Sequence, residues 1–224
     1  MGFLLDEDAM PRPFDLVVFD IGGVLVELAR FWDGAAERAG LPFPGASRDA
    51  FDARVAALPS RDRGAVDSES YYVLFAEASE GVYSAADAAR IDAAELVAEQ
   101  PGIGGVFDVL DTVGVETVLL SNVNDAHWAR FFAVPRGDEE FPTLLRARHR
   151  FASYILGMMK PDPAVYRHIE ATTGFEASRI LYFDDSSRYV TGARGLGWAA
   201  EVIDPSGDTA AQMLGHLRRL GVID

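Results

Sequence analysis

The feature that most constrains this chain is the apolar stretch 14–19, which ends on a carboxylate, Asp20, and is followed at once by Gly22 and Gly23. Apolar residues at consecutive positions predict a strand buried on both faces, as in a parallel sheet. Ligands of such sheets bind beyond the carboxyl ends of the strands, where Asp20 would lie. Glycines permit a sharp turn and a close approach of the backbone to a ligand. Taken alone, the stretch leaves open a catalytic aspartate and an ordinary strand followed by a turn.

Farther along the chain, strand patterns alternate with helix patterns, which indicates an α/β fold with a doubly wound parallel sheet. We expect strands at 116–122, 179–183 and 199–203, and helices at 106–113, 163–174 and 209–220. Asp162 is a natural N-cap with Pro163 at the first helical position, and Gly174 is placed to end that helix. Thr209 and Gln212 have the spacing of a capping box for the last helix.

Between the first two predicted strands the composition changes. Residues 31–100 are rich in Ala, Glu, Asp and Arg, with apolar residues at helical spacing and breaks at Gly40–Gly45 and Leu58–Pro59. We expect three or four helices here and no strand. The chain is therefore predicted to have an α/β core at 11–29 and 101–224, an inserted all-helical cap at 30–100 and an N-terminal tail at 1–10.

Charge and composition restrict the partners. The net charge of −15 disfavours binding to nucleic acid or to an anionic membrane surface. The absence of cysteine excludes disulfides and thiol catalysis. The N-terminus lacks the basic start and apolar run of a signal peptide, and no uncharged apolar run approaches the roughly 18–20 residues of a membrane span. We expect a cytoplasmic protein; the sequence does not indicate its oligomeric state.

Polar side chains follow several of the predicted strands. Asp20, Ser121 with Asn122, and Asp184 with Asp185 come at strand ends, and Lys160 lies in a loop before a helix. In a parallel sheet these groups gather at one edge. Clustered carboxylates repel one another unless a cation binds, and Mg²⁺ prefers such oxygen ligands. A carboxylate nucleophile with Mg²⁺, a lysine and a hydroxyl is the equipment for phosphoryl transfer.

In order and placement, four motifs resemble those of the haloacid dehalogenase-like (HAD) hydrolases, specifically the phosphatases with a small helical cap after the first strand. The matching segments are Phe19–Leu25, Leu119–Asn122, Lys160–Asp162, and Tyr182–Ser186 continuing through Gly192–Ala193 and Gly197–Trp198. They span nearly the whole chain. The resemblance implies a Rossmann-like core, a Mg²⁺ cofactor and hydrolysis of a small phosphorylated metabolite, similar to a sugar phosphate.

The resemblance also implies roles for individual residues. Asp20 would be the nucleophile that forms an aspartyl-phosphate. Mg²⁺ would be held by Asp20, the Gly22 carbonyl and Asp185, and Asp184 would be either a further ligand or a residue that contacts the ligands. The phosphate would be bound by Gly22, Gly23, Ser121 and Lys160, of which Lys160 also offsets charge at the nucleophile. Asn122 would be a substrate-facing or a structural amide.

One position departs from the family pattern. Most family phosphatases carry an aspartate two residues after the nucleophile, as the general acid and base, whereas this chain has Gly22. Such an acid contributes typically 10²–10⁴-fold to the rate. The same glycine occurs in a subgroup that resembles sugar-phosphate phosphatases. Tyr189 also stands where a small polar residue is common.

Three functions are therefore considered. The first is a Mg²⁺-dependent phosphatase, whose activity the missing acid would reduce. The second is a catalytically degenerate binding protein, which the glycine would favour, and the third is a 2-haloacid dehalogenase, against which Asp184 and Asp185 argue. Candidate substrate contacts, for which core or surface roles are the alternative, are Trp32, Arg54, Arg61, Arg63, Tyr71, Tyr72 and His127.

Overall fold

A five-stranded parallel sheet forms the centre of the molecule in the computed structural model, which describes residues 12–29, 31–42, 48–133 and 139–224. The strands are β1 (Leu16–Phe19), β4 (Glu116–Ser121), β5 (His149–Ala152), β6 (Ile180–Asp184) and β7 (Ala199–Val202), in the order β5-β4-β1-β6-β7. β1 pairs in parallel with β4 and β6, so that Phe19 lies beside Leu119 and Phe183. The predicted doubly wound α/β fold is confirmed.

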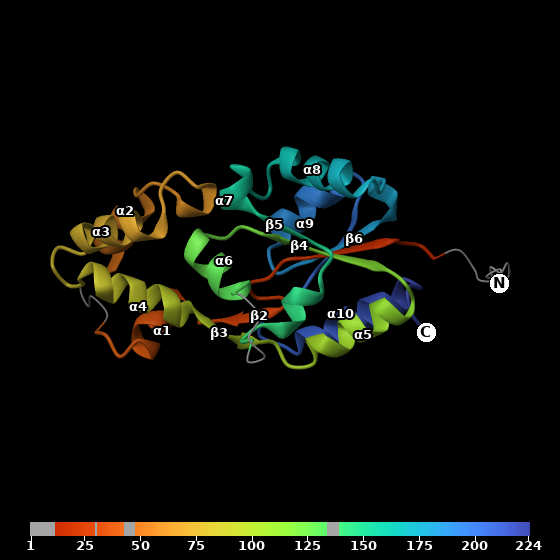
Figure 1. Ribbon diagram of the computed structural model, residues 1–224, viewed down its shortest axis with the longest axis horizontal. Coiled ribbons are helices and arrows are strands. Elements are labelled where there is room, and N and C mark those ends of the chain that lie inside the picture. Colours follow the sequence, from red (N-terminus) through yellow and green to blue (C-terminus); the bar gives the residue numbers. More distant parts are fainter. Residues whose placement is uncertain (1–11, 30, 43–47, 134–138) are drawn as a thin grey trace.

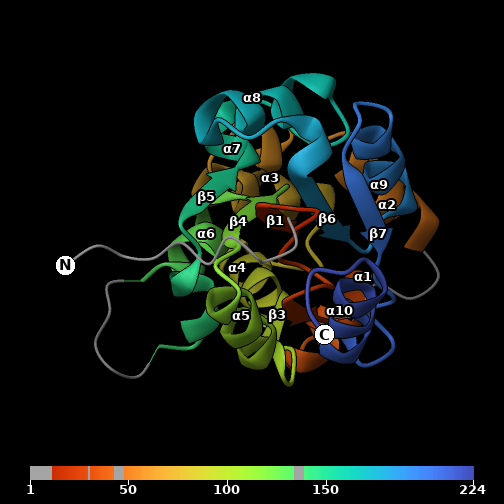
Figure 2. The same cartoon turned by 90° about the vertical axis from the view of Figure 1, so that its right-hand side faces the viewer.

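Helices cover both faces of the sheet (Figures 1 and 2). On one face lie α5 (Ile103–Thr112) and α10 (Thr209–Arg219), and on the other lie α8 (Pro163–Thr173) and α9 (Ser187–Arg194). Val17 and Phe19 point into the first apolar layer and Leu16 and Val18 into the second, and all four are fully buried. The uninterrupted apolar run of β1 is thus explained by alternate side chains that enter two separate cores.

The inserted segment forms a second body at one end of the molecule (Figure 1). Its helices are α1 (Phe31–Arg38), α2 (Arg48–Ala56), α3 (Ser68–Ala78) and α4 (Ala85–Glu95), with a short 3₁₀ helix, η1, at Arg61–Arg63. Phe51, Phe75, Tyr83 and Ile91 form its own apolar core. The helical character predicted for this segment is confirmed, and we call it the cap.

One expectation about the cap is wrong. Its last residues, Leu96–Glu99, form strand β3, which pairs antiparallel with β2 (Val26–Leu28), although no strand was predicted between residues 31 and 100. The two strands are the two connections between core and cap. A strand of four residues that directly follows a helix is too short to show an alternating pattern of apolar and polar residues. Its partner, β2, precedes the whole cap in the sequence.

Two short helices of the core contact the cap: α6 (Asp125–Phe131), which follows β4, and α7 (Ser153–Leu156), which follows β5. Further 3₁₀ turns, η2 and η3, lie at Pro142–Arg146 and Ala177–Arg179. Among the described residues, none of the helices is both long and apolar enough to cross a membrane.

The helix ends test the capping predictions. Asp162 accepts a hydrogen bond from the Ala164 amide at 2.9 Å, and Gly174 ends α8 in the left-handed conformation, as predicted. For α10 the predicted cap is wrong: Asp208, not Thr209, is the N-cap and accepts from the Ala211 amide. The Asp208 carboxylate, one residue before Thr209, accepts the hydrogen bond from an amide of the first turn. Thr209 is therefore the first residue of the helix. The predicted tail at 1–10 and the break at 43–45 lie outside the described residues.

Candidate active site

The carboxyl ends of β1, β4 and β6 place Asp20, Ser121 and Asp184 along one edge of the sheet. Lys160, from the loop before α8, extends into this row: its Nζ lies 2.9 Å from Asp20 Oδ1 and 2.7 Å from Asp184 Oδ2. The Lys160 side chain is fully buried. Four groups that the sequence placed far apart are therefore brought together at the predicted edge.

Asn122 holds the lysine loop in place. Its Oδ1 accepts from the Lys160 amide at 2.9 Å, and its Nδ2 donates to the Lys160 carbonyl at 3.1 Å. The structure thus favours the structural role for Asn122 among the two considered. Tyr189, the unusual residue of the fourth motif, lies alongside: Asn122 Nδ2 donates to its hydroxyl at 3.3 Å, and Lys160 Nζ lies 5.0 Å from its ring centroid. Tyr189 therefore adds a cation–π contact to the buried ammonium.

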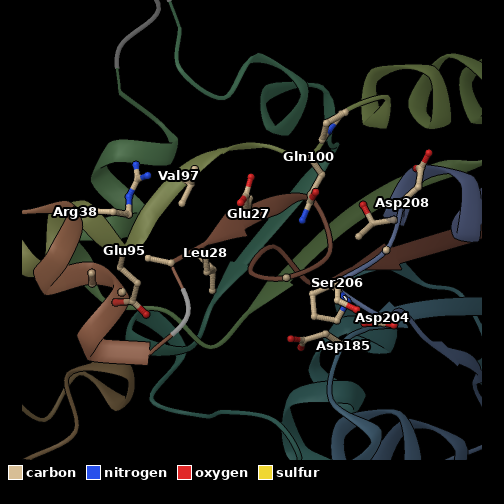
Figure 3. Close-up of a pocket in the computed structure, with 18 of the residues that line it drawn as sticks. Glu27, Leu28, Arg38, Glu95, Val97, Gln100, Asp185, Asp204, Ser206 and Asp208 are labelled. Carbon is tan, nitrogen blue, oxygen red and sulfur yellow. Dashed lines mark hydrogen bonds between the residues drawn. The ribbon is translucent and has the colours of Figure 1, made fainter.

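The two consecutive aspartates have different surroundings. Asp184 is completely buried; its Oδ1 accepts from the Ser186 amide at 2.7 Å, and its Oδ2 accepts from Lys160 and from the Tyr182 hydroxyl. Asp185 is exposed and faces the larger cavity described below (Figure 3). Asp184 is therefore a fixed anchor for the lysine, whereas the carboxylate of Asp185 is accessible.

The electrostatics of this cluster are dominated by crowded carboxylates. Burial raises the pKa of Asp20 above its ordinary value in spite of the adjacent lysine, and the carboxylates of Asp184 and Asp185 raise it further. Burial would lower the pKa of Lys160, but Asp20 and Asp184 outweigh it and hold the amine charged. Burial and the neighbouring Asp184 likewise raise the pKa of Asp185.

Ligand atoms of Asp20, Asp184 and Asp185 lie within 4.8 Å of one another. Three carboxylates beside one ammonium leave an excess of negative charge, presented by hard oxygen atoms. This donor set fits a divalent cation such as Mg²⁺, which takes carboxylate oxygens and completes its shell with water or phosphate oxygens.

The glycine turn after Asp20 is tightly packed on both sides. Gly23 has a φ of +73°, and a Cβ there would lie 2.5 Å from Asp185 Oδ2, so the turn requires glycine. A Cβ on Gly22 would lie 2.8 Å from Leu28 Cδ1. The space beside Gly22, where family relatives are expected to carry the acid, is thus filled by an apolar side chain from β2.

Two cavities open between core and cap next to these residues. The larger, about 1330 Å³, is bordered by Gly23 and Asp185 of the core and by cap and linker residues (Figure 3). The smaller, about 350 Å³, is bordered by Gly22, Ser121 and Asn122. Leu28, Trp32 and Glu95 line both cavities. There is accordingly room for a small molecule beside the strand ends.

The candidate substrate contacts fall into two groups. Trp32, Arg61, Tyr71 and His127 line the smaller cavity. Others have structural partners: Arg54 donates to the Ala78 carbonyl, and Tyr72 donates to Asp92 at 2.7 Å. Arg63 is exposed and is absent from the lining of both cavities.

Three cavity-lining residues, Leu28, Asp62 and Glu95, were missed by sequence reasoning. They come from β2, η1 and the end of α4, and no local pattern marks them.

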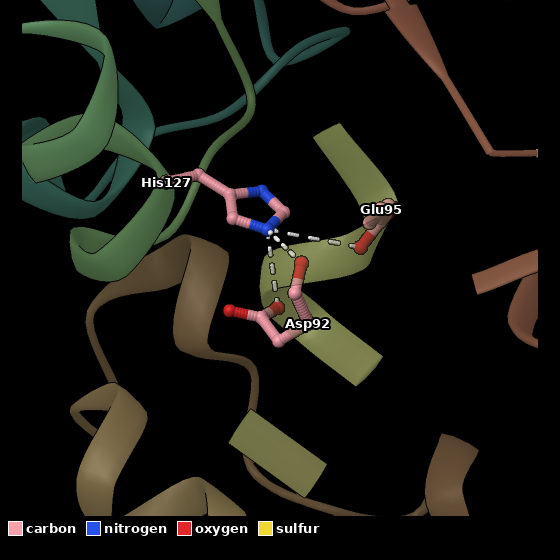
Figure 4. Close-up of side chains that lie close together, drawn as sticks. All are labelled: Asp92, Glu95 and His127. Carbon is pink, nitrogen blue, oxygen red and sulfur yellow. Dashed lines mark hydrogen bonds and ion pairs between the residues drawn. The ribbon is translucent and has the colours of Figure 1, made fainter. Parts of the chain in front are cut away.

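Beside the smaller cavity, α6 of the core meets α4 of the cap (Figure 4). His127 Nε2 lies 3.0 Å from the Asp92 carbonyl, 3.2 Å from Asp92 Oδ1 and 3.9 Å from Glu95 Oε2. Arg61 Nη1 lies 2.5 Å from the same Asp92 oxygen. Although burial opposes ionisation, His127, Arg61 and Tyr72 lower the pKa of Asp92 to about 2. Burial would lower the pKa of His127, but Asp92 and Glu95 raise it.

Hydrogen bonds also fasten the cap to the core. The Ser68 hydroxyl donates to Asp125 Oδ1 at 2.5 Å, and the Ser153 hydroxyl donates to the Asp62 carbonyl at 2.6 Å. The structure thus represents a docked cap that covers the carboxyl edge of the sheet.

Comparison with known proteins adds independent findings. Over 72 residues the chain is 38% identical to a Mycobacterium tuberculosis (strain CDC 1551 / Oshkosh) protein named Phosphatase MT3486; this covers 32% of the chain and about a third (33%) of that protein. A HAD family enzyme from Bacteroides thetaiotaomicron, in complex with magnesium and inorganic phosphate, superimposes with a TM-score of 0.69 at 19% identity, over 89% of this chain and 98% of that chain.

An L-2-haloacid dehalogenase from Xanthobacter autotrophicus has the same fold, with a TM-score of 0.59 at 16% identity over 91% of this chain and 83% of that chain. At these identities the structural likeness shows the fold alone. The family model for haloacid dehalogenase-like hydrolases, in contrast, matches residues 14–197, from the strand before Asp20 to the turn after α9. The chain therefore belongs to the haloacid dehalogenase-like hydrolases.

Proposed function

We propose that this protein is a Mg²⁺-dependent phosphatase that hydrolyses a small phosphorylated metabolite through an aspartyl-phosphate on Asp20. One observation carries the proposal: Lys160 Nζ bridges Asp20 and Asp184 at the sheet edge, beside the accessible carboxylate of Asp185. This arrangement provides a nucleophile, a fixed positive charge and oxygen donors for a metal in one place. The named phosphatase relative and the relative that binds magnesium and phosphate support it.

In the first step, an Asp20 carboxylate oxygen attacks phosphorus opposite the leaving oxygen, and the bond from phosphorus to that oxygen breaks. Lys160 lies against the nucleophile and offsets the charge of the incoming phosphate. The Ser121 hydroxyl, buried at the end of β4, donates to a phosphate oxygen, and Gly22 and Gly23 let the backbone approach it. Water then attacks the aspartyl-phosphate and releases inorganic phosphate and Asp20.

The residues that would hold Mg²⁺ are Asp20, Asp185 and the Gly22 carbonyl, with Asp184 next to them. Mg²⁺ bound there supplies positive charge that offsets the charge on the phosphate oxygens. Asp184 is already bound by Lys160, Tyr182 and the Ser186 amide, so we assign it mainly to orienting the lysine.

Because dehalogenases share this fold, only the residues of the site can distinguish a phosphatase from a dehalogenase. Asp184 and Asp185 together favour a metal-dependent reaction over the metal-independent dehalogenase reaction that was considered from the sequence. A binding protein without catalysis would have no need for a buried lysine poised on the nucleophile, since the pair costs desolvation.

The test is hydrolysis of p-nitrophenyl phosphate with Mg²⁺ and with chelator, for the wild type, Asp20→Asn and Asp15→Asn. Asp15, at the opposite end of the first strand and paired with Arg179, is the matched control. We expect turnover that requires Mg²⁺, falls by at least about 10³-fold in Asp20→Asn and is retained in Asp15→Asn. Equal turnover in Asp20→Asn and the wild type would refute the proposal.

A further inference from the structure

The proposed reaction lacks a proton donor at the usual place. An alkoxide leaves phosphorus slowly at neutral pH unless an acid protonates it. Gly22 carries no side chain, and Leu28 occupies the neighbouring space, since a Cβ on Gly22 would lie 2.8 Å from Leu28 Cδ1. A proton donor for the leaving group therefore has to come from another element that borders the same space.

Glu95 borders that space from the cap. It is the last residue of α4, immediately before the linker strand β3. Together with Leu28 it lines the larger cavity (Figure 3) and also the smaller one. Its main chain is fixed to the other linker, because the Ala29 amide donates to the Glu95 carbonyl at 2.8 Å. Its side chain is 36% exposed, and the residue borders both cavities.

Other acidic residues of the region are less well placed. Asp92 is 2% exposed, is bound by Arg61, His127 and Tyr72, and lines neither cavity. Asp62 lines the smaller cavity only, whereas Glu27 lines the larger cavity only. Among the described acidic residues, Glu95 is the one that borders both cavities, as Leu28 does.

We propose that Glu95 is the general acid and base of this phosphatase, a catalytic residue supplied by the cap in place of the missing aspartate at position 22. The inference rests on the proposed function and adds to it. It assigns phosphate esters of ordinary alcohols, and not only activated phosphates, to the substrates of this enzyme.

The surroundings of Glu95 raise the pKa of its carboxyl group above the ordinary value. Burial raises its pKa, and the carboxylates of Asp92 and Asp62 act in the same direction, whereas His127 and Arg61 oppose them. The His127 contact, at 3.9 Å, is too long for a strong hydrogen bond. A carboxyl group with a raised pKa is better suited to donate a proton and to accept one later.

Atoms and charge are conserved in both steps of the reaction. Asp20 forms a bond to phosphorus while the bond to the leaving oxygen breaks, and that oxygen takes both the bonding electron pair and the Glu95 proton, which releases an alcohol. The Glu95 carboxylate then takes a proton from water as the water oxygen attacks phosphorus. The bond from Asp20 to phosphorus breaks, and inorganic phosphate, the Asp20 carboxylate and protonated Glu95 are restored.

The experiment compares two substrates that differ in their need for a proton. p-Nitrophenolate leaves without protonation, whereas the alcohol of a sugar or glycerol phosphate does not. In Glu95→Gln we expect kcat/KM to fall about 10²–10³-fold for the alkyl phosphate and less than about threefold for the aryl phosphate. The alkaline limb of the alkyl pH–rate profile should disappear as well. Glu77→Gln, the same substitution at an exposed residue of α3 that lines neither cavity, should leave the turnover of both substrates unchanged.

A rescue variant separates a chemical role from a structural one. Because Leu28 fills the space beside Gly22, we expect Gly22→Asp combined with Leu28→Ala to restore alkyl phosphate turnover to Glu95→Gln, and Gly22→Asp alone to restore less.

Equal losses for both substrates in Glu95→Gln, or no loss for either, would overturn the assignment. So would a selective loss of alkyl turnover in Asp62→Asn and not in Glu95→Gln, or a wild type that turns over aryl phosphates only. These results differ from failure of the proposed function, in which Asp20→Asn is as active as the wild type or the wild type is silent on both substrates.

Discussion

Two clusters of charged side chains adjoin the cavities between core and cap, and their composition is similar. The strand-end cluster comprises Asp20, Lys160, Asp184 and Asp185, and the junction cluster comprises Arg61, Asp92, Glu95 and His127. Each contains three side chains with potential metal-ligand atoms within 4.8 Å of one another. By proximity alone, either could be taken for a metal site.

Charge balance separates them. In the strand-end cluster one ammonium contacts two carboxylates, and a third is nearby, so negative charge is in excess. In the junction cluster two carboxylates, Asp92 and Glu95, face one guanidinium and one imidazole, so the charges balance. Burial, reinforced by Asp184 and Asp185, raises the pKa of Asp20, whereas His127, Arg61 and Tyr72 lower the pKa of Asp92 to about 2 in spite of its burial. The strand-end cluster therefore lacks positive charge that a bound cation can supply, whereas the junction cluster already contains cationic side chains.

Removing the central cation of each cluster should reveal this difference most strongly. Lys160→Met leaves two carboxylates buried without their partner, and we expect the free energy of unfolding to fall by about 3–5 kcal/mol. Arg61→Met leaves Asp92 with His127 and Tyr72, so we expect a loss of about 2 kcal/mol. Urea denaturation of the two variants measures both values. A larger loss in Arg61→Met would contradict the comparison.

Metal addition should act on one cluster alone. Mg²⁺ at one hundred times its dissociation constant stabilises a folded protein by about 2.7 kcal/mol, and we expect a rise in Tm of the wild type at saturating Mg²⁺. Asp185→Asn should abolish this rise, because it removes the accessible carboxylate of the strand-end cluster. Asp92→Asn should retain it. Thermal unfolding with and without Mg²⁺ distinguishes the outcomes, and a response lost in Asp92→Asn would transfer the metal to the junction.

The strand-end cluster could be predicted from the sequence, because each of its strand ends has a recognisable local pattern. Asp20, Ser121 and Asp184 each end an apolar run, and a parallel sheet brings such ends together. Lys160 precedes a helix whose Asp162 cap and Pro163 are visible in the sequence. These features depend on residues close together in the chain, and the structure confirms that they meet at one edge.

The junction could not be predicted in the same way. Leu28, Glu95 and His127 meet only because the linker strands pair and the cap rests on α6, and these contacts join residues far apart in the sequence. A Leu in a short strand or a Glu at the end of an Ala-rich helix has no distinguishing pattern. The place of the missing aspartate was evident from Gly22, whereas the side chain that fills its space required the fold.

Acid titration offers a finer test of the junction cluster. The pKa of Asp92 is about 2 in the folded protein, below the ordinary 3.8, so its ionised form stabilises the fold at neutral pH. That contribution is complete above about pH 4 and is lost as the pH falls through 2, and the shift corresponds to about 2 kcal/mol. The difference in unfolding free energy between the wild type and Asp92→Asn should shrink by this amount from pH 5 to about pH 2. Urea denaturation at stepped pH measures it. A constant difference would mean that Asp92 gains nothing from Arg61 and His127, and the contrast between a balanced junction and an unbalanced strand-end cluster would be lost.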